Sequence, residues 1–282
     1  MSERLPNFIY LGPSKAGSTW LHEVLIRHPQ IYMTGAKDLY FFDRYYDRGL
    51  EWYRGHFTDA RPEHRVMGEV CQEYLSSPES AERMHDCLGD DLRLMVTIRE
   101  PAARAFSAYL YMRKHGVFEG SFREALETRP GMIDHSRYAS LLSSYTERFG
   151  REAIYCGVFD DLQEDPQAFI DELLTWLGVE PMVLDASSLE ARLPASKARS
   201  VPVARLVKYG ANWARQRNAG TLIGRVKRSR AVQGALYKPL EADRPLLSDD
   251  DAQWVRERLV SEIVRLEEMF GVELRRRWNW PA

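Results

Sequence analysis

The sequence is poor in cysteine and contains no long uninterrupted run of hydrophobic residues. Its three cysteines, Cys71, Cys87 and Cys156, are widely spaced, with no CxxC pair and no histidine in metal-ligand register. We therefore expect free, mostly structural thiols rather than a disulfide framework or a zinc site. No stretch approaches the ~18 apolar residues of a membrane helix, and the apolar run at the start is too short for a secretory signal. We expect a soluble, cytoplasmic protein.

An excess of one charge is also missing. The 39 Lys and Arg against 41 Asp and Glu give a formal net charge of -2, which argues against nucleic-acid or membrane partners. Acidic residues are absent, however, from residues 191–240, which hold twelve Lys or Arg, so the rest of the chain carries a formal charge of -14. This basic, mostly helical segment fits either a solvated helical face or a flap that closes over an anionic ligand.

The 282 residues, 44% of them hydrophobic, suffice for a sizeable core. Short, nearly continuous apolar runs indicate buried strands, at residues 8–11, 92–98 and 153–159. Helical spacing of apolar residues occurs at 21–28, 138–145, 170–177 and 254–270. The last stretch follows a helix-start signature at Ser248. Strands that alternate with helices favour an α/β fold with a parallel sheet, and we predict one domain over residues 1–282.

A glycine-containing loop, residues 12–19, connects the first predicted strand to the first predicted helix. Free backbone N–H groups and the positive end of a helix can hold an anion at such a connection. The loop contains two glycines that allow close approach of the main chain, two hydroxyl donors and one positive charge. These residues are Gly12, Lys15, Gly17, Ser18 and Thr19.

The spacing differs from that of a nucleoside-triphosphate loop. That loop reads GxxxxGK[ST], with the lysine directly after the second glycine and a hydroxyl on Mg²⁺. Here Ser18 follows Gly17, and Lys15 lies inside the loop. No Asp that would hold Mg²⁺ follows the next strand, which ends in Arg99. A nucleoside or small-molecule kinase is therefore the less favoured enzyme.

Residues 14–21, SKAGSTWL, closely resemble the PKxGTTWL loop of sulfotransferases that use 3'-phosphoadenosine 5'-phosphosulfate (PAPS). The resemblance implies a P-loop-like central parallel sheet flanked by helices, with no metal required. It also implies that the loop binds the 5'-phosphosulfate and that Lys15 contacts the transferred group and the leaving oxygen. The cofactor-binding residues implied here are Lys15, Ala16, Gly17, Ser18, Thr19 and Trp20.

Residues 94–109 resemble the 3'-phosphate segment of the same family, in which an arginine at a strand end and a serine eight positions later hold the phosphate. Arg99 and Ser107 have this interval. The placement is physically suitable, because Pro101 fits the first turn of a helix and a guanidinium at a strand end can bind phosphate through two hydrogen bonds.

Further segments extend the resemblance, to the bacterial and carbohydrate-type branch, at residues 136–141, 154–159 and 161–166. Residues 196–199, SKAR, resemble the SKGR-like loop that closes over the cofactor, which implies binding by Ser196, Lys197 and Arg199. Ala198 replaces the family's glycine. If that glycine has φ above zero, the replacement predicts a different loop shape.

Residues 66–78 partly resemble the EKTPSYF segment of the carbohydrate branch, whose glutamate is the general base. Glu69 is therefore our candidate base. Three neighbours depart from the pattern: Val70, Cys71 and Gln72. A surface or helix-capping role for Glu69 is the alternative, and other side chains that fit a base are Glu73, His22 and His56.

Residues 37–42, KDLYFF, resemble the KE-x-x-FF stretch near the acceptor cleft. Lys37 is expected to orient the acceptor or to help neutralise the sulfo group, whereas Phe41 and Phe42 are expected in the core. Nearby aromatic residues either stack on a sugar or aromatic acceptor or simply pack: Tyr40, Tyr45, Tyr46, Trp52 and Tyr53.

Together these segments predict an enzyme that moves the sulfo group from PAPS to a hydroxyl, or less favourably an amine, and releases 3',5'-ADP (PAP). The acceptor is expected to be a small molecule, a natural product or a carbohydrate. The predicted catalytic residues are Lys15, Glu69 and Lys37. A non-catalytic anion- or polysaccharide-binding module that relies on residues 191–240 is the other alternative. Neither the acceptor nor the oligomeric state follows from the sequence.

Overall fold

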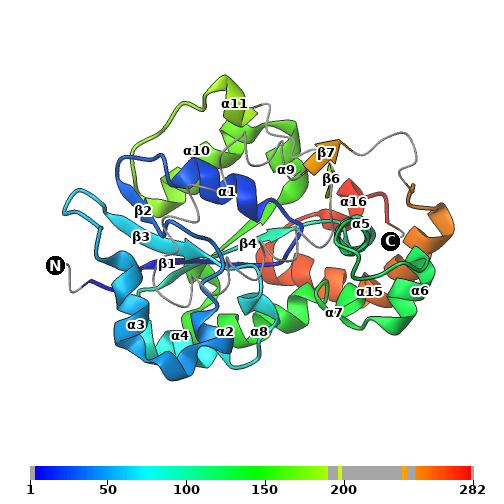
Figure 1. The fold of residues 1–282 in the computed structure, drawn as a ribbon, viewed down its shortest axis with the longest axis horizontal. Helices are drawn as coiled ribbons and strands as arrows, with labels where there is room; N and C mark the ends of the chain where they lie inside the picture. Colours follow the sequence, from blue (N-terminus) through cyan, green and yellow to red (C-terminus); the bar gives the residue numbers. More distant parts are fainter. Residues whose placement is uncertain (1–3, 190–195, 199–236, 240–244, 281–282) are drawn as a thin grey trace.

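The computed structural model describes residues 4–189, 196–198, 237–239 and 245–280. At its centre lies a five-stranded parallel sheet with the order β2-β3-β1-β4-β5 (Figure 1). The strands are β1 (Phe8–Gly12), β2 (Ile31–Met33), β3 (Val66–Val70), β4 (Arg93–Ile98) and β5 (Ile154–Val158). This sheet and its flanking helices confirm the α/β fold class that the sequence predicts.

Helices follow most of the strands. The α-helices are α1 (Ser18–Leu25), α2 (Phe41–Arg44), α3 (Leu50–Arg54), α4 (Ser80–Leu88), α5 (Pro101–Lys114), α6 (Phe122–Thr128), α7 (Gly131–Asp134), α8 (Tyr138–Phe149), α9 (Phe159–Glu164), α10 (Pro166–Leu177), α11 (Ala186–Leu189), α15 (Asp249–Phe270) and α16 (Leu274–Arg277). Short 3-10 turns are η1 (Tyr46–Arg48), η2 (Gly55–Phe57), η3 (Tyr74–Ser76) and η4 (Arg151–Ala153).

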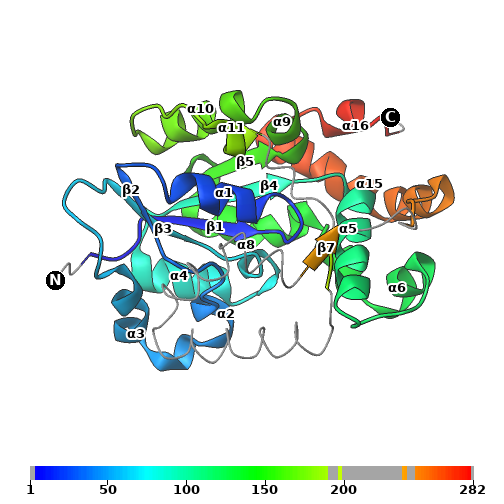
Figure 2. The ribbon, with the colours of Figure 1, turned by 45° about the horizontal axis from the view of Figure 1, so that its top comes forward.

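Helices cover both faces of the sheet (Figure 2). Because side chains alternate along a strand, Tyr10 and Met95 belong to one core cluster, with α1 and α10. Ile9 and Leu94 belong to the other cluster, with α4, α8 and α15. The strands are buried on both faces, which explains why the predicted ones read as nearly continuous apolar runs.

Two strands of the central sheet are missing from the sequence prediction. β2 has only three residues, too few to show a pattern. β3 reads VMGEV and holds a glycine and a charged residue, which are unusual in a central strand. Gly68 is needed there because a Cβ at this position would lie 2.5 Å from the carbonyl oxygen of Phe8. Glu69 is the next residue and is fully buried.

The predicted helix boundaries are confirmed where capping residues mark them. The Ser248 hydroxyl accepts a hydrogen bond of 3.2 Å from the amide of Asp251 at the start of α15. Gly178 and Gly271 end α10 and α15 with φ of 68°, a left-handed conformation that favours glycine. α5 begins at Pro101, as predicted.

Most of the basic segment at residues 191–240 lies outside the described residues. Two short strands in it, β6 (Ser196–Ala198) and β7 (Tyr237–Pro239), pair antiparallel, and β6 contacts α5 (Figures 1 and 2). Arg199 lies outside the described residues, and for Ser196 and Lys197 only the backbone is described. The helical character of the segment and the single domain over residues 1–282 stay predictions.

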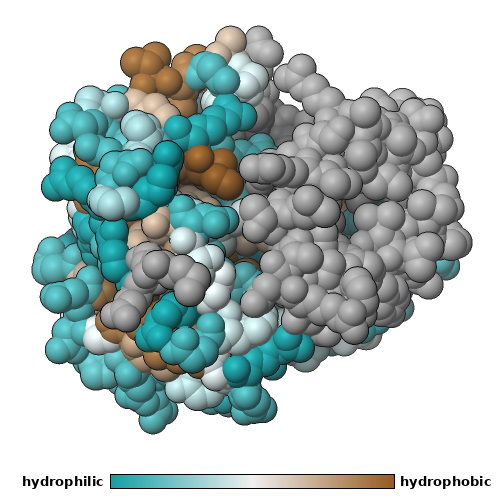
Figure 3. Space-filling model, turned by 60° about the vertical axis from the view of Figure 1, so that its left-hand side comes forward, coloured by the Kyte–Doolittle hydropathy of each residue, from teal (hydrophilic) through white to brown (hydrophobic). Residues whose placement is uncertain are grey.

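The surface near the amino end of the sheet is mainly hydrophilic, with small separate hydrophobic patches among the coloured residues (Figure 3). Among the described residues, the exposed large hydrophobic side chains are scattered along the chain and are Tyr111, Val117, Val183, Leu189 and Leu246. Within the described ranges, no helix is both long and apolar enough to cross a membrane.

Candidate functional site

The predicted site residues gather at one edge of the sheet. All five strands are parallel, so their carboxyl ends meet at this edge. From β1 the chain first continues to β2 and β3 on one side and then crosses to β4 on the other side of β1. Ligands of open α/β sheets bind where the strand order reverses in this way, here between the carboxyl ends of β1 and β4. The loop with Lys15 follows β1, and Arg99 follows β4.

The loop after β1 has a tight, unusual backbone. Gly12, Lys15 and Gly17 have φ of 123°, 72° and 91°. A Cβ on Gly12 would lie 2.7 Å from the carbonyl oxygen of Gln72, so the loop passes directly over the residues that follow β3. Gly17 precedes α1 and provides no side-chain cap, which leaves the first amides of the helix without a side-chain acceptor. Lys15 thus has a left-handed backbone conformation, which is disfavoured for residues with a side chain. Disfavoured conformations of this kind are common at ligand-binding sites.

Lys15 is held among other cations. Its Nζ lies 3.6 Å from the centre of the Tyr111 ring, which is a cation–π contact. Burial, together with the charges of Lys37, Lys114 and Arg99, lowers the pKa of Lys15 to about 7. The ammonium is therefore only partly charged at neutral pH, and an arriving anion would favour its protonated form.

Arg99 joins the strand end of β4 to the loop. Its Nη1 donates a hydrogen bond of 2.8 Å to the carbonyl oxygen of Lys15, and its guanidinium carbon lies 4.6 Å from the Phe159 ring centre. The Tyr138 hydroxyl donates to the Arg99 carbonyl oxygen at 2.8 Å. Ser107 lies within α5, the helix that follows Arg99, and is half-buried. The two predicted 3'-phosphate residues thus lie directly after β4 and within α5, the helix that follows it.

Lys37 also reaches the loop. It follows β2, yet its Nζ donates hydrogen bonds of 2.8 Å to Ser18 Oγ and 3.2 Å to Thr19 Oγ1. The acceptor-side lysine predicted from the sequence is therefore in direct contact with the predicted phosphosulfate loop. Among the residues that the structure describes, no acidic side chain forms an ion pair with Lys15, Lys37 or Arg99. Three cationic side chains thus gather near the loop after β1, and the carboxylates of Asp160 and Glu100 act on Arg99 only from beyond ion-pair distance.

Trp20 and Ala16 are buried in the protein. The Trp20 indole N–H donates to the carbonyl oxygen of Ser188 at 2.9 Å, and its ring packs edge-on against Phe169. The side chain of Trp20 therefore belongs to the core, and a role in cofactor binding would fall to its backbone. That part of the prediction stays untested.

Glu69, the predicted base, lies inside the core with 0% exposure. Its Oε1 accepts hydrogen bonds from Tyr53, at 2.8 Å, and from Tyr74, at 3.0 Å. Its Oε2 is buried and has no hydrogen-bond partner among the described residues. Burial raises the pKa of Glu69 to about 8, so the carboxyl group holds its proton at neutral pH.

The alternative bases are also constrained. The His22 Nε2 lies 2.8 Å from the carbonyl oxygen of Thr34, and this ring is buried. Burial lowers the pKa of His56 to about 4, and its ring packs against Trp52. Glu73 is half-buried and lies 3.6 Å from Arg44 Nη2.

Asp38 is a site residue that the sequence reasoning did not single out. It directly follows Lys37, and its backbone has φ of 59°. Its amide donates to the Val70 carbonyl oxygen at 2.8 Å, and its Oδ1 accepts from the Gln72 amide at 3.2 Å. The available signal was its place in KDLYFF, at the position of the glutamate in the KE-x-x-FF pattern.

The aromatic residues of this region divide into two groups. Phe41 and Phe42 are buried in the core, as predicted, and Tyr53 stacks on Phe41 with ring centres 4.5 Å apart. Tyr53 therefore packs rather than binds an acceptor. The half-buried Tyr40 and Tyr45 lie under the guanidinium groups of Arg44 and Arg48, and Arg48 also lies over Trp52.

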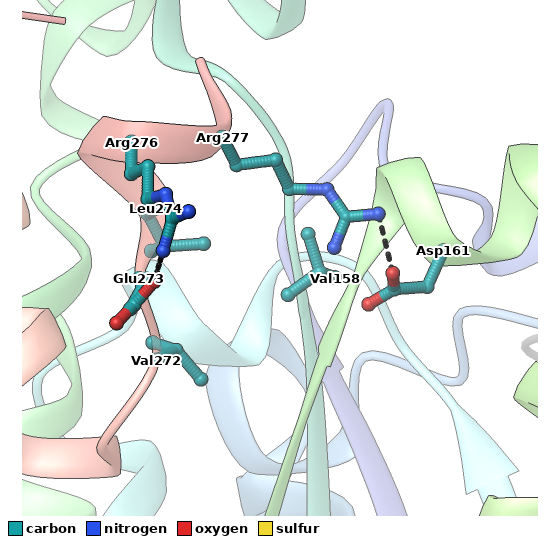
Figure 4. Close-up of a pocket in the computed structure, with 7 residues that line it drawn as sticks. All are labelled: Val158, Asp161, Val272, Glu273, Leu274, Arg276 and Arg277. Atoms are coloured by element: carbon teal, nitrogen blue, oxygen red, sulfur yellow. Dashed lines mark hydrogen bonds and ion pairs between the residues drawn. The ribbon is translucent and has the colours of Figure 1, made fainter. Parts of the chain in front are cut away.

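A cavity of about 460 Å³ lies elsewhere, between the end of β5, α9 and α16 (Figure 4). Its lining consists of Val158, Asp161, Val272, Glu273, Leu274, Arg276 and Arg277. Both arginines in it are already paired, Arg277 with Asp161 and Arg276 with Glu273. None of the predicted site residues lines this cavity. Within the described part of the chain, no group of three His, Cys, Asp or Glu side chains could hold a metal ion.

Comparisons with known proteins agree with this geometry. A family model described as a sulfotransferase domain matches residues 5–218. The chain is 32% identical over 147 residues to the membrane-associated sulfotransferase kil1 of Dictyostelium discoideum, which covers 48% of this chain and 31% of that protein. It is 29% identical over 191 residues to heparan sulfate glucosamine 3-O-sulfotransferase 6 of Mus musculus, which covers 64% of this chain and 55% of that protein. The chain thus matches about a third to a half of the length of these relatives.

Solved structures show the same fold. A sulfotransferase from Alicyclobacillus acidocaldarius has a TM-score of 0.61 at 25% identity, over 78% of this chain and 96% of that one. A sulfotransferase domain from the curacin biosynthetic pathway has a TM-score of 0.51 at 14% identity, over 92% of this chain and 99% of that one. The family match over residues 5–218 includes the loop after β1, the β4–α5 connection and Lys37. With the site geometry above, it establishes that this chain belongs to the sulfotransferase domain family.

Proposed function

We propose that this protein transfers the sulfo group of PAPS to a hydroxyl group of a small-molecule, natural-product or carbohydrate acceptor and releases PAP. The observation that carries the proposal is the meeting of Lys15, Lys37 and Arg99 at the loop after β1, where none of the three forms an ion pair with a described acidic side chain. Cations held together in a partly buried place are unfavourable unless an anion joins them. A nucleotide with anionic groups at both ends of its ribose supplies that anion.

The switch point between β1 and β4 offers two anion-binding places. The backbone and hydroxyls of residues 16–19, with Lys15, would hold the 5'-phosphosulfate. Arg99 and Ser107 would hold the 3'-phosphate, because a guanidinium can donate two parallel hydrogen bonds to it. The resemblance adds three residues of the closing loop: Ser196, Lys197 and Arg199.

The transfer forms a bond between the acceptor oxygen and sulfur and breaks the bond between sulfur and the bridging phosphate oxygen. The acceptor's proton passes to a base on the protein. Lys15 and Lys37 are the cations near the loop that would neutralise charge on the departing phosphate oxygen. No metal ion is required for any of these steps.

Asp38 fits the role of the base better than Glu69 does. Asp38 keeps 7% exposure and directly follows Lys37, whereas Glu69 is completely enclosed. A carboxyl group that already holds its proton at neutral pH cannot take one from the acceptor hydroxyl. We therefore assign proton acceptance to Asp38 in the proposed reaction.

Binding of nucleotides tests the donor. We expect PAP to raise the melting temperature more than ADP, ATP or 5'-AMP, with and without Mg²⁺, because only PAP carries the 3'-phosphate for Arg99. A larger shift with ATP and Mg²⁺ would favour the kinase instead. No shift with any nucleotide would favour the non-catalytic binding module.

The acceptor needs a separate experiment. The protein is incubated with PAPS and a panel of alcohols, sugars and amines, and mass spectrometry detects products heavier by one SO₃ group. We expect this gain in mass on acceptors with a hydroxyl group. The Lys15→Ala variant serves as the control for uncatalysed transfer. The name of the Mus musculus relative refers to O-sulfation of glucosamine, which supports the inclusion of amino sugars in the panel.

A further inference from the structure

Among the described residues, Glu69 is the fully buried carboxyl group with 0% exposure, and its partners lead toward the site. The Tyr74 hydroxyl donates to Glu69 Oε1 at 3.0 Å, and its oxygen accepts a hydrogen bond of 2.9 Å from the Phe41 amide. The Phe41 N–H can only donate, so the phenol oxygen is the acceptor in that bond, and the phenol hydrogen is the one donated to Glu69 Oε1. Glu69, Tyr74 and Phe41 thus form a buried relay.

The Phe41 amide is the first of α2 and has no acceptor within that helix. The preceding residue, Tyr40, offers no side-chain cap, so the Tyr74 hydroxyl is the acceptor that satisfies this amide. A buried amide without an acceptor is unfavourable, and this contact therefore determines where α2 begins.

The backbone before α2 is strained. Asp38 and Tyr40 have φ of 59° and 57°, in the left-handed region that residues with side chains rarely adopt. Such conformations persist only where surrounding contacts hold them, and they concentrate at functional sites. This strained segment, residues 37–40, carries Lys37 to the loop after β1 and places the Asp38 carboxylate against the amide of Gln72, the residue over which that loop passes.

Residues 70–74, which end and follow β3, hold residues 38–41 at three points. The Val70 carbonyl oxygen accepts from the Asp38 amide, the Gln72 amide donates to Asp38 Oδ1, and Tyr74 accepts from Phe41. The third point is the only one of these that depends on a single side-chain hydroxyl. That hydroxyl is oriented by the buried carboxyl group.

We propose that Glu69 is a positioning residue that acts through Tyr74 to fix the backbone of residues 37–41. Its role is to accept the Tyr74 hydroxyl hydrogen, so that the phenol oxygen faces the Phe41 amide. The consequence for catalysis rests on the proposed function, because residues 37 and 38 are assigned there. The effect on the backbone of residues 37–41 does not rest on the proposed function.

Hydrogen exchange on the full chain tests the relay without any activity measurement. In Tyr74→Phe we expect the amides of residues 38–42 to exchange about tenfold faster or more, because one buried hydrogen bond is lost. Tyr53→Phe is the matched control. It removes the other hydroxyl on the same carboxyl oxygen, keeps the ring that stacks on Phe41, and should leave this exchange unchanged. Equal exchange in both variants would overturn the proposal.

Substitution of Glu69 separates a positioning role from that of a base. Glu69→Gln keeps an oxygen that accepts from both phenols, so we expect slow exchange and turnover within about threefold of the unchanged protein. Glu69→Leu removes the acceptor and should speed exchange at residues 38–42. If Glu69→Leu does not fold, the exchange rates of Tyr74→Phe still test whether the Tyr74 hydroxyl fixes residues 38–42.

A loss of turnover of about a hundredfold or more in Glu69→Gln, with exchange unchanged, would identify a general base and overturn the assignment. For activity, Tyr74→Phe combined with Glu69→Gln should be no slower than Tyr74→Phe alone, because both act through one contact. A protein that shows the exchange pattern but no stabilisation by PAP would refute the proposed function and leave the relay intact.

Discussion

Lys37 Nζ donates a hydrogen bond of 2.8 Å to Ser18 Oγ, although the two residues lie on connections that follow different strands. Lys37 follows β2, at one edge of the sheet, whereas Ser18 begins α1 after the central β1. The ammonium thus joins the segment proposed for the acceptor side to the loop proposed for the phosphosulfate. A substitution at either end of this bond should affect both halves of the site.

Lys37→Met should weaken PAP binding by about tenfold, because Ser18 and Thr19 lose a charged partner and the anion loses a cation. Isothermal titration calorimetry measures the change. Lys37→Arg, which keeps the charge, is the control, and its Kd for PAP should lie between that of the unchanged protein and that of Lys37→Met. An unchanged Kd in Lys37→Met would mean that this lysine acts on the acceptor alone.

Lys15 and Arg99 should separate turnover from binding. Lys15→Ala is expected to lower kcat mainly, because its charge matters most as the leaving group departs, while Arg99→Ala should mainly raise the Kd of PAP. Arg93→Ala is a matched control at the opposite end of β4, where its guanidinium binds the Leu177 carbonyl oxygen. Equal and negligible effects of the first two changes would refute the site.

PAP binding should take up protons near neutral pH. The pKa of Lys15 in the free protein is about 7, and a bound anion raises it, so the bound state holds more protons above that pH. Affinity should therefore fall as pH rises above 7. Calorimetry in buffers with different ionisation enthalpies measures the uptake, which Lys15→Met should abolish. Uptake that persists in this variant would place the titrating group elsewhere.

Glu69 should make the protein less stable as pH rises. The pKa of Glu69 is about 8 in the folded protein, against an ordinary value of 4.5 that applies to the unfolded chain. Between these two pH values the folded state therefore binds one more proton than the unfolded state. The free energy of unfolding should decline through this window, by a few kcal/mol at most. Urea unfolding at pH 5 and pH 8 measures the slope. Glu69→Gln should flatten it relative to Tyr53→Phe, and an equal slope in both variants would contradict the burial argument.

The α/β class and three strands followed from local sequence patterns, because central parallel strands are buried on both faces and read as apolar runs. The loop from Gly12 to Thr19 could also be located, since glycines, hydroxyls and a lysine at a strand-to-helix connection favour anion binding. The pair Arg99 and Ser107 was located through its resemblance to the 3'-phosphate segment of the family. β2 and β3 could not be predicted. One is too short for a pattern, and the other contains Gly68 and Glu69 for reasons that lie in neighbouring strands.

The sequence by itself located the glycines, hydroxyls and lysine of the loop after β1, because groups that favour anion binding stand together at a strand-to-helix connection. Only the tertiary structure decided what Glu69 and Lys37 contact. Glu69 accepts hydrogen bonds from Tyr53 and Tyr74, and Lys37 donates to Ser18, through contacts between different elements of the fold. The burial of a side chain and the charges near it depend on how the whole sheet packs with its helices, so they cannot be predicted from the spacing of residues in the sequence.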